Sequence, residues 1–146
     1  MDIQQLSGPT EESLRVERRG ESVWKFFRTV PNRERWQHPD DWLRQLDRRV
    51  EIMREFREIA GIRLNTVDEW RRDELVLVTP FVEGPHPTVE EAKVVRSAIG
   101  NTPLGFLGDL TRWNMICSAE GLVLIDFDLY DHGYARFRSM TQNSPY

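Results

Sequence analysis

The sequence predicts an α+β fold in which an antiparallel sheet comes first and helices and further strands follow. Three observations predict it. Strand-like segments joined by a glycine-containing turn fill the first 27 residues. Apolar residues then recur at three- and four-residue spacing over 41–60, as on one face of a helix. A helix-start signature at Thr88 follows two more strand-like segments.

The first part of the chain divides into strands, a loop and a helix. Gly20 supplies the permissive backbone that a hairpin turn at 18–21 needs. The polar, proline-containing stretch 32–40 predicts a loop, and Asp40 or Asp41 is expected to cap the helix after it. The expected strands are 3–6, 14–17 and 22–27, and the buried helical stripe is Leu43, Leu46, Val50 and Met53, ending at Gly61.

The second part of the chain, after Gly61, is also predicted to contain strands and a helix. Strands are expected at 64–70 and 74–79. Thr88, with Glu91 three residues later, forms a capping-box pattern for a helix that Gly100 ends. Short strands around a loop are expected up to Asp128, and an irregular polar tail after it.

Composition narrows the function classes. The 146 residues carry 20 basic and 24 acidic side chains, a net charge of −4 that gives no electrostatic footprint for nucleic acid. The lone cysteine, Cys117, excludes an intrachain disulfide. Mean hydropathy is −0.57, and neither a signal peptide nor a membrane-spanning run is recognisable. We therefore expect a cytoplasmic protein, or an effector delivered elsewhere, with no membrane span.

The chemistry is concentrated in the last third of the chain. Asn114 follows Asp109 by five positions (114 − 109), and Asp126 follows Asn114 by twelve (126 − 114). Phosphoryl transfer needs a carboxylate that orients or deprotonates the attacking hydroxyl, and groups that hold Mg²⁺ against the phosphates. Oxygen ligands such as carboxylates suit Mg²⁺. The apolar run before Asp126 is expected to deliver it to the same cleft.

The motif Gly-Asp-Leu-Thr-x-x-Asn-Met-Ile, with Ile-Asp-Phe after it, resembles the protein-kinase-like superfamily. It is similar to the atypical branches: the RIO kinases, lipopolysaccharide kinases, aminoglycoside or choline phosphotransferases and, above all, the small kinase of the KEOPS complex. The resemblance implies ATP and Mg²⁺ as cofactors. It implies that Asp109 is the catalytic base, that Asn114 and Asp126 ligate the metal, and that Asp128 is a weaker candidate for an accessory acid.

The same resemblance assigns a role to Lys25. The segment Val-Trp-Lys-Phe-Phe is similar to the third strand of the kinase N-lobe, whose lysine contacts the α- and β-phosphates. The alternative is a structural lysine whose stem covers apolar surface. Residues 7–13 stand where the phosphate-covering loop belongs, but Gly8 is the only glycine there, so the usual G-x-G-x-x-G is missing.

The segment 76–84 resembles the fifth strand and hinge of kinases. The resemblance makes Thr79 the gatekeeper, and lets the Pro80 carbonyl and the Val82 amide read adenine, with Ile116 and Ile125 as the apolar floor. Without it, these residues read as a buried strand and a turn.

The helix over 41–60 would be the αC-type helix, whose glutamate pairs with the strand lysine. Glu51 is our assignment, although it falls near the middle of the polar face. Aligning the apolar positions puts Arg49 in the glutamate's place, and Glu55 is a third option. Leu107 also departs from the family, since most relatives have a histidine before the Gly-Asp pair.

We therefore predict one minimal kinase-like domain: 1–82 N-lobe-like, 83–128 with the hinge, helix, catalytic loop and metal-binding segment, and 129–146 a tail. Only 18 residues (146 − 128) follow Asp128, so the C-lobe is strongly reduced. The expected function is ATP- and Mg²⁺-dependent phosphotransfer by a protein (Ser/Thr) kinase or autokinase, with a protein as substrate or partner. The alternatives are a pseudokinase that binds nucleotide or protein, and an AMP-transferring enzyme of the same fold.

Overall fold

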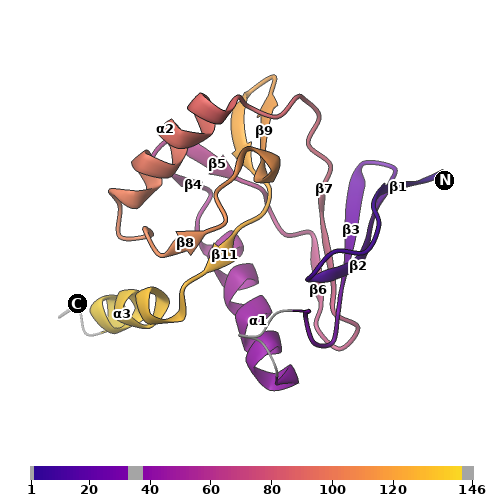
Figure 1. The fold of residues 1–146 in the computed structure, drawn as a ribbon, viewed down its shortest axis with the longest axis horizontal. Coiled ribbons are helices and arrows are strands. Elements are labelled where there is room, and N and C mark those ends of the chain that lie inside the picture. Colours follow the sequence, from indigo (N-terminus) through magenta and orange to yellow (C-terminus); the bar gives the residue numbers. More distant parts are fainter. Residues whose placement is uncertain (1, 33–37, 143–146) are drawn as a thin grey trace. The chain divides into compact units, whose positions relative to one another are not determined.

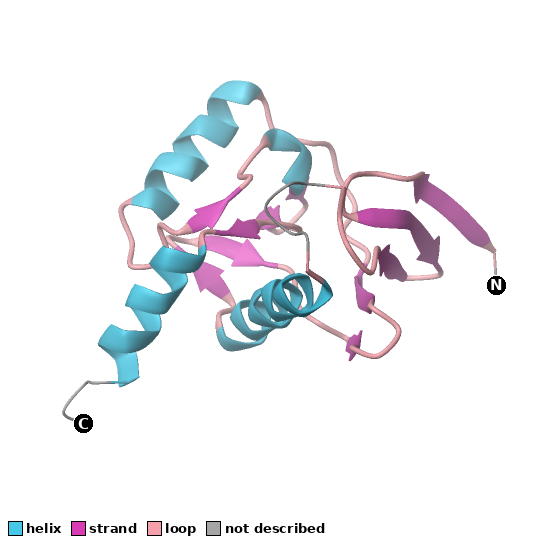
Figure 2. Cartoon of the chain, turned by 60° about the horizontal axis from the view of Figure 1, so that its bottom comes forward, coloured by secondary structure: helices cyan, strands magenta, loops and turns pink. Residues whose placement is uncertain are grey.

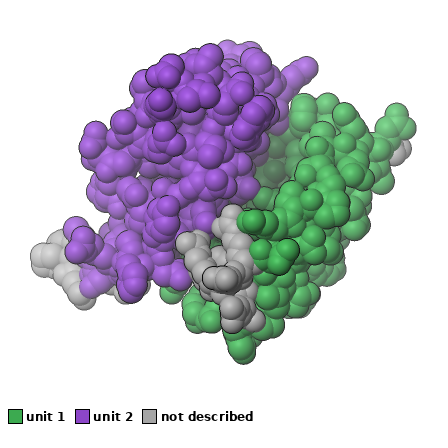
Figure 3. Space-filling model, in the orientation of Figure 1, with its two compact units in different colours: residues 1–55, 66–81 green, residues 56–65, 82–146 purple. Residues whose placement is uncertain are grey.

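The computed structural model describes residues 2–32 and 38–142. Within these ranges it has three α-helices and mostly antiparallel strands, which confirms the predicted α+β class. The chain forms two compact units (Figure 3). Unit 1 comprises residues 1–55 and 66–81, and unit 2 comprises 56–65 and 82–146.

Unit 1 contains a five-stranded antiparallel sheet and one helix (Figure 1). The sheet order is β1-β2-β3-β7-β6, and helix α1 spans Pro39–Glu55. The predicted hairpin turn at Gly20 is confirmed: Arg19 pairs with Ser22, and Gly20 has a φ of 64°. The strand bounds are β1 Ile3–Ser7, β2 Ser13–Arg19, β3 Ser22–Phe27, β6 Glu69–Arg71 and β7 Val76–Pro80.

The core of unit 1 is aromatic. The rings of Trp42 and Trp70 each meet the ring of Phe27 edge-on at 6.1 Å. Each indole nitrogen donates a hydrogen bond, from Trp42 to the Arg28 carbonyl at 2.8 Å and from Trp70 to the Asp47 carboxylate at 2.9 Å. These bonds satisfy the polar ends of the buried Trp42 ring and the half-buried Trp70 ring. They fix α1 against the face of the sheet that carries Phe27.

Unit 2 is built around a four-stranded sheet of order β4-β5-β10-β9. Figure 2 draws the strands of the chain in magenta and its helices in cyan. The central pair of the four-stranded sheet, β5 and β10, is parallel, with Leu64 opposite Leu124, while β9 and β10 form an antiparallel hairpin. A two-stranded sheet of β8 and β11 accompanies it. The bounds are β4 Glu58–Ile59, β5 Ile62–Leu64, α2 Val89–Gly100, β8 Leu107–Gly108, the 3-10 helix η1 Arg112–Asn114, β9 Met115–Ser118, β10 Gly121–Leu124, β11 Asp128–Leu129 and α3 Asp131–Gln142.

The start of α2 confirms the predicted capping box. The hydroxyl of Thr88 accepts a hydrogen bond from the amide of Glu91 at 3.1 Å, and the Glu91 carboxylate accepts one from the amide of Thr88 at 2.9 Å. The second bond lowers the pKa of Glu91, because it favours the ionised carboxyl. The helix ends at Gly100, as predicted.

Two predicted elements are wrong at their ends. Helix α1 stops at Glu55 rather than at Gly61, because residues 58–64 form the hairpin of β4 and β5, whose turn has both Ala60 and Gly61 at positive φ. Asp40 and Asp41 lie inside the first turn of α1 and do not precede it. The predicted strand 64–70 is two short strands, β5 in unit 2 and β6 in unit 1.

The predicted irregular tail is also wrong, since residues 131–142 form helix α3. Aromatic contacts hold this helix in unit 2: the Phe106 ring lies 6.0 Å from Tyr134 and 5.5 Å from Phe137. A methyl group on Gly133 would lie 2.2 Å from the Phe106 Cβ, so glycine permits the close approach. Among the described residues, none of the helices is long and apolar enough to cross a membrane.

Candidate functional site

The two ends of the predicted catalytic segment are brought together by β8 and β11. Asp128 pairs with Gly108 across this small sheet, although twenty residues (128 − 108) separate them in the chain. Asp109 follows β8 directly, between the buried Gly108 and Leu110, and is itself exposed. Its φ of 53° lies in the left-handed region, which aspartate adopts more readily than most residues. The loop therefore turns sharply at Asp109 and leaves its carboxyl accessible.

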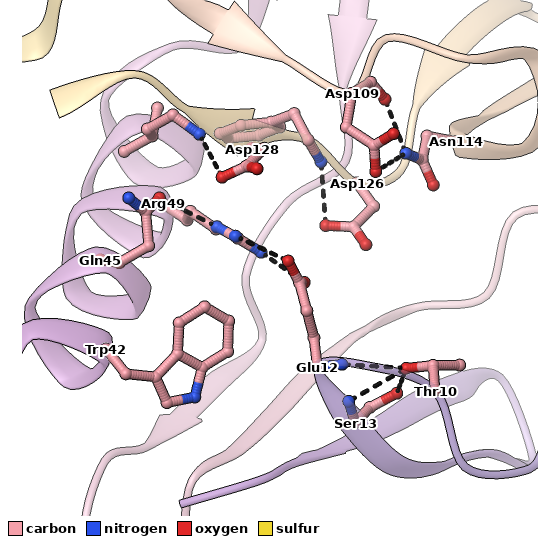
Figure 4. A network of polar contacts seen from close by, with 12 residues as sticks. Thr10, Glu12, Ser13, Trp42, Gln45, Arg49, Asp109, Asn114, Asp126 and Asp128 are labelled. Atoms are coloured by element: carbon pink, nitrogen blue, oxygen red, sulfur yellow. Dashed lines mark hydrogen bonds and ion pairs between the residues drawn. The ribbon is translucent and has the colours of Figure 1, made fainter. Parts of the chain in front are cut away.

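Asn114 holds this turn in place (Figure 4). Its side-chain amide donates to the Asp109 carbonyl at 2.7 Å and to the Asp109 carboxylate at 3.1 Å. Both partners are acceptors, so only the NH₂ end of the amide fits there. The amide oxygen of Asn114 consequently points away from Asp109.

Asp126 is the neighbour of Asn114. It follows β10, and the amide of Ile125 donates to the Asn114 carbonyl at 2.8 Å. One carboxylate oxygen of Asp126 accepts from the amide of Phe127 at 2.9 Å, which fixes the side-chain rotation. Asp128 makes the equivalent bond to Leu129 at 2.8 Å but is only 8% exposed. Asp126 is thus the more accessible of the two acids.

These donors suit a hard cation. Within residues 2–32 and 38–142, no group of three His, Cys, Asp or Glu side chains could hold a metal ion by itself. An amide oxygen from Asn114 and a carboxylate from Asp126 are oxygen ligands of the kind that Mg²⁺ accepts. Mg²⁺ commonly takes one or two protein ligands and fills its remaining positions with water and phosphate oxygens. The donor set therefore fits Mg²⁺.

The predicted hinge and floor residues of unit 2 lie on different elements: Ile116 is in β9, Ile125 follows β10, and Val82 precedes Gly84 in the segment before α2. Ile116 is buried, and Ile125 and Val82 are half-buried. Gly84 has a φ of 146°, and a methyl group there would lie 2.1 Å from the Cys117 carbonyl oxygen. The Pro85 carbonyl in turn accepts from the Cys117 amide at 2.7 Å. The segment after Val82 is thus pressed against the strand that carries Ile116.

Lys25 and Thr79 occupy one face of the sheet in unit 1. Lys25 lies opposite Leu77, and Thr79 lies opposite Val23, so strand alternation puts Lys25 and Thr79 on the same side. Phe27 shares that side and packs on α1. The Lys25 ammonium lies 5.1 Å above the Phe27 ring. Thr79 is buried, and Pro80, which follows it, is half-buried opposite Ser22.

Helix α1 turns Arg49 inward. Arg49 is 5% exposed, donates to Gln45 at 3.1 Å, and makes two contacts with the Glu12 carboxylate, at 3.0 and 3.2 Å. Glu51 and Glu55 are exposed. They line a shallow depression of about 380 Å³ together with Asp47, Val50, Arg54 and Trp70. Arg49, Glu51 and Glu55 were the three options for the position of the αC-type glutamate. Of these, only Arg49 lies in the buried row of the helix.

The ion pair of Arg49 with Glu12 was not predicted from the sequence. Its signal is an arginine inside an apolar helical stripe, between Leu46 and Met53. Charged side chains are rarely buried unless they are paired, so such an arginine requires an acidic partner. The partner belongs to the loop between β1 and β2, the segment that the resemblance assigns to phosphate contact.

Comparisons with models of protein families, with curated proteins and with solved structures find no match to this chain. The site is therefore characterised by its own chemistry and geometry. Unit 2 brings together Asp109, Asn114 and Asp126 on two neighbouring loops. Unit 1 carries Lys25 and Thr79 on a common sheet face.

Proposed function

We propose that this chain is an ATP- and Mg²⁺-dependent phosphotransferase of protein-kinase-like fold that transfers phosphate to a protein hydroxyl. One observation carries the proposal: the side-chain amide of Asn114 donates hydrogen bonds to both the backbone carbonyl and the carboxylate of Asp109. This bond orients a base candidate and a metal-ligand candidate with respect to each other. Asp126, joined to the same loop through the Ile125 amide, supplies the second ligand.

Each residue has a defined task in this proposal. The accessible carboxylate of Asp109 accepts a hydrogen bond from the attacking hydroxyl and takes its proton as the new bond to phosphorus forms. The Asn114 amide oxygen and the Asp126 carboxylate hold Mg²⁺, which neutralises charge on the phosphates. Lys25 is assigned to the α- and β-phosphates. We expect a cytoplasmic protein from the sequence, and ATP and Mg²⁺ are both present in the cytoplasm.

The nucleotide contacts follow the resemblance. Thr79 is the gatekeeper, and the Pro80 carbonyl and Val82 amide bind the adenine edge. Proline is compatible with the first hinge position because only its carbonyl is needed there. Ile116 and Ile125 give the base an apolar floor.

The test is transfer of ³²P from ATP to the chain or to added protein, with Asp109→Asn as the decisive variant. Asparagine tolerates the left-handed backbone and keeps an acceptor for Asn114, so the loop is expected to retain its shape. Loss of the base should lower the rate by about 10²-fold or more. Asp73→Asn, at an exposed turn of unit 1, is the matched control and should label normally. Full labelling by Asp109→Asn would refute the role of Asp109.

A second candidate is a pseudokinase that binds nucleotide or protein without transferring phosphate. The observation that favours it is Arg49, which occupies the buried row of α1 and pairs with Glu12. Thermal denaturation with and without Mg·ATP separates the candidates. Nucleotide at 100 times its Kd stabilises the protein by about 2.7 kcal/mol. A shift without transfer would favour the pseudokinase, and a mass increase equal to AMP on a modified protein would indicate AMP transfer.

A further inference from the structure

Tyr130 is held beside the catalytic loop by its backbone. Its amide donates to the Phe106 carbonyl at 3.0 Å, and its carbonyl accepts from the Tyr134 amide at 3.0 Å. The preceding residue, Leu129, is fully buried and pairs with Leu107. The position of residue 130 is therefore fixed by β8 on one side and by the first turn of α3 on the other.

The side chain of Tyr130 lies over the residue that precedes Asp109. A methyl group on Gly108 would lie 3.0 Å from Cε2, 3.1 Å from Cζ and 3.3 Å from Oη of Tyr130. The hydroxyl end of the ring, rather than its base, is thus the part that meets the loop. Any larger residue at 108 would push the ring away. Glycine at this position therefore allows the phenol to lie one residue from the base candidate.

The phenol is also accessible. Tyr130 is 55% exposed, although it is a large aromatic residue. Its hydroxyl forms no hydrogen bond with any of the residues 2–32 and 38–142 for which the structure gives positions. By contrast, Tyr134 is 7% exposed and its hydroxyl accepts a bond from Arg138 at 3.2 Å. Of these two tyrosines, Tyr130 is the exposed one, and its hydroxyl end lies against Gly108, the residue before Asp109.

We infer that Tyr130 is an intramolecular phosphate acceptor of this chain. The inference rests on the proposed phosphotransferase function and names its substrate class, a tyrosine hydroxyl of the same molecule. The phenolic oxygen attacks the γ-phosphorus of ATP, and a new P–O bond forms. The bond from the γ-phosphorus to the β,γ-bridging oxygen breaks, and ADP leaves with that electron pair. The phenolic proton passes to the Asp109 carboxylate and from there to water.

Three other hydroxyls of unit 2 are held by hydrogen bonds to backbone carbonyls. The hydroxyls of Thr102, Ser118 and Thr141 donate to the carbonyls of Ile99, Gly121 and Phe137. Thr111 lies within the loop itself, and its hydroxyl does not cap η1. Phosphoamino-acid analysis separates phosphothreonine from phosphotyrosine, so labelling of Thr111 would be recognised directly.

The experiment uses the full chain incubated with Mg²⁺ and [γ-³²P]ATP, followed by phosphoamino-acid analysis and peptide mapping. We expect phosphotyrosine at residue 130, with no more than one phosphate there per chain. Tyr130→Phe keeps the ring on Gly108 and should reduce phosphotyrosine to the level of Asp109→Asn. Tyr134→Phe is the matched control and should label like the wild type. Labelling per molecule should not change when the protein is diluted, because donor and acceptor belong to one chain.

Several results would overturn the inference: phosphotyrosine that persists in Tyr130→Phe, label confined to serine or threonine, or a rate per molecule that rises with protein concentration. Phosphorylation of an added protein without labelling of Tyr130 would overturn it while leaving the proposed function intact. Absence of all transfer, together with no thermal shift by Mg·ATP, would overturn both.

Discussion

Glu12 and Arg49 form an ion pair in unit 1 that is largely shielded from water. Their side chains are 14% and 6% exposed, and the guanidinium contacts both carboxylate oxygens. Glu12→Gln removes the negative charge but keeps the size of the side chain and one acceptor. The Arg49 guanidinium then stays buried beside Gln45 and the Trp42 ring, which lies 5.3 Å away, without that charge.

The expected loss follows from this burial. Two unit charges 4 Å apart attract each other by about 4 kcal/mol at an effective dielectric constant of 20. Removing one member of a buried pair typically costs about 3–5 kcal/mol, since the other charge remains desolvated. Glutamine still accepts one bond, so we expect Glu12→Gln to lower the free energy of unfolding by about 3 kcal/mol. Arg49→Met removes the more deeply buried charge, so the two losses should not add, and the coupling energy should be about 2 kcal/mol.

Urea denaturation followed by tryptophan fluorescence measures these changes, because Trp42 and Trp70 lie in the core of unit 1. The control is Glu69→Gln, which breaks the exposed pair of Glu69 with Arg71 and should cost no more than about 1 kcal/mol. Equal stability of Glu12→Gln and Glu69→Gln, or full additivity of the losses in Glu12→Gln and Arg49→Met, would contradict a buried pair of coupled charges.

Three further changes test the structure of unit 2. Gly84→Ala should lower the free energy of unfolding by about 3 kcal/mol or more, because the added methyl group would lie 2.1 Å from a carbonyl oxygen of β9. The control Gly100→Ala should not lower it by a comparable amount, because a methyl group there meets no atom within 4 Å. Ala60→Asn should raise the melting temperature, since the left-handed φ of 54° costs an ordinary residue about 1 kcal/mol and asparagine less. The pKa of Glu91 is lowered by the Thr88 amide, so its stabilising contribution is present above the ordinary value of 4.5 and is lost as the pH falls through the folded-state value. In Glu91→Gln the melting temperature should therefore fall less steeply with decreasing pH, and an unchanged slope would contradict the assignment.

Local patterns in the sequence predicted local structure well. The capping box of Thr88 and Glu91 and the turn at Gly20 depend on residues only a few positions apart, and both are confirmed. The predicted end of α1 was wrong because the residues after Glu55 lead into β5. This strand pairs with β10, some sixty residues later, and no local pattern reveals that partner. Helix α3 was missed because its inner face has few apolar residues, mainly Tyr134 and Phe137, whose ring partners lie outside the helix.

In the candidate site, too, local structure could be predicted from the sequence and long-range contacts could not. Asp109 and Asn114 were singled out as a pair by their five-residue spacing, and their side chains are hydrogen-bonded. Their catalytic and metal-binding roles stay predictions. The approach of Tyr130 to Gly108 depends on pairing between β8 and β11 across twenty residues, which the sequence does not encode locally.

Unit 2 is assembled from two separate stretches of chain, 56–65 and 82–146, and this has a practical consequence for splitting the protein. A cut between residues 81 and 82 would leave β4 and β5 on the N-terminal fragment and their partner β10 on the C-terminal one. Neither fragment would contain the whole four-stranded sheet, so the fragments should recover a folded unit 2 only when mixed. The chain thus offers a natural split point for a two-fragment complementation assay, in which recovery of folded unit 2 would report that the fragments have met.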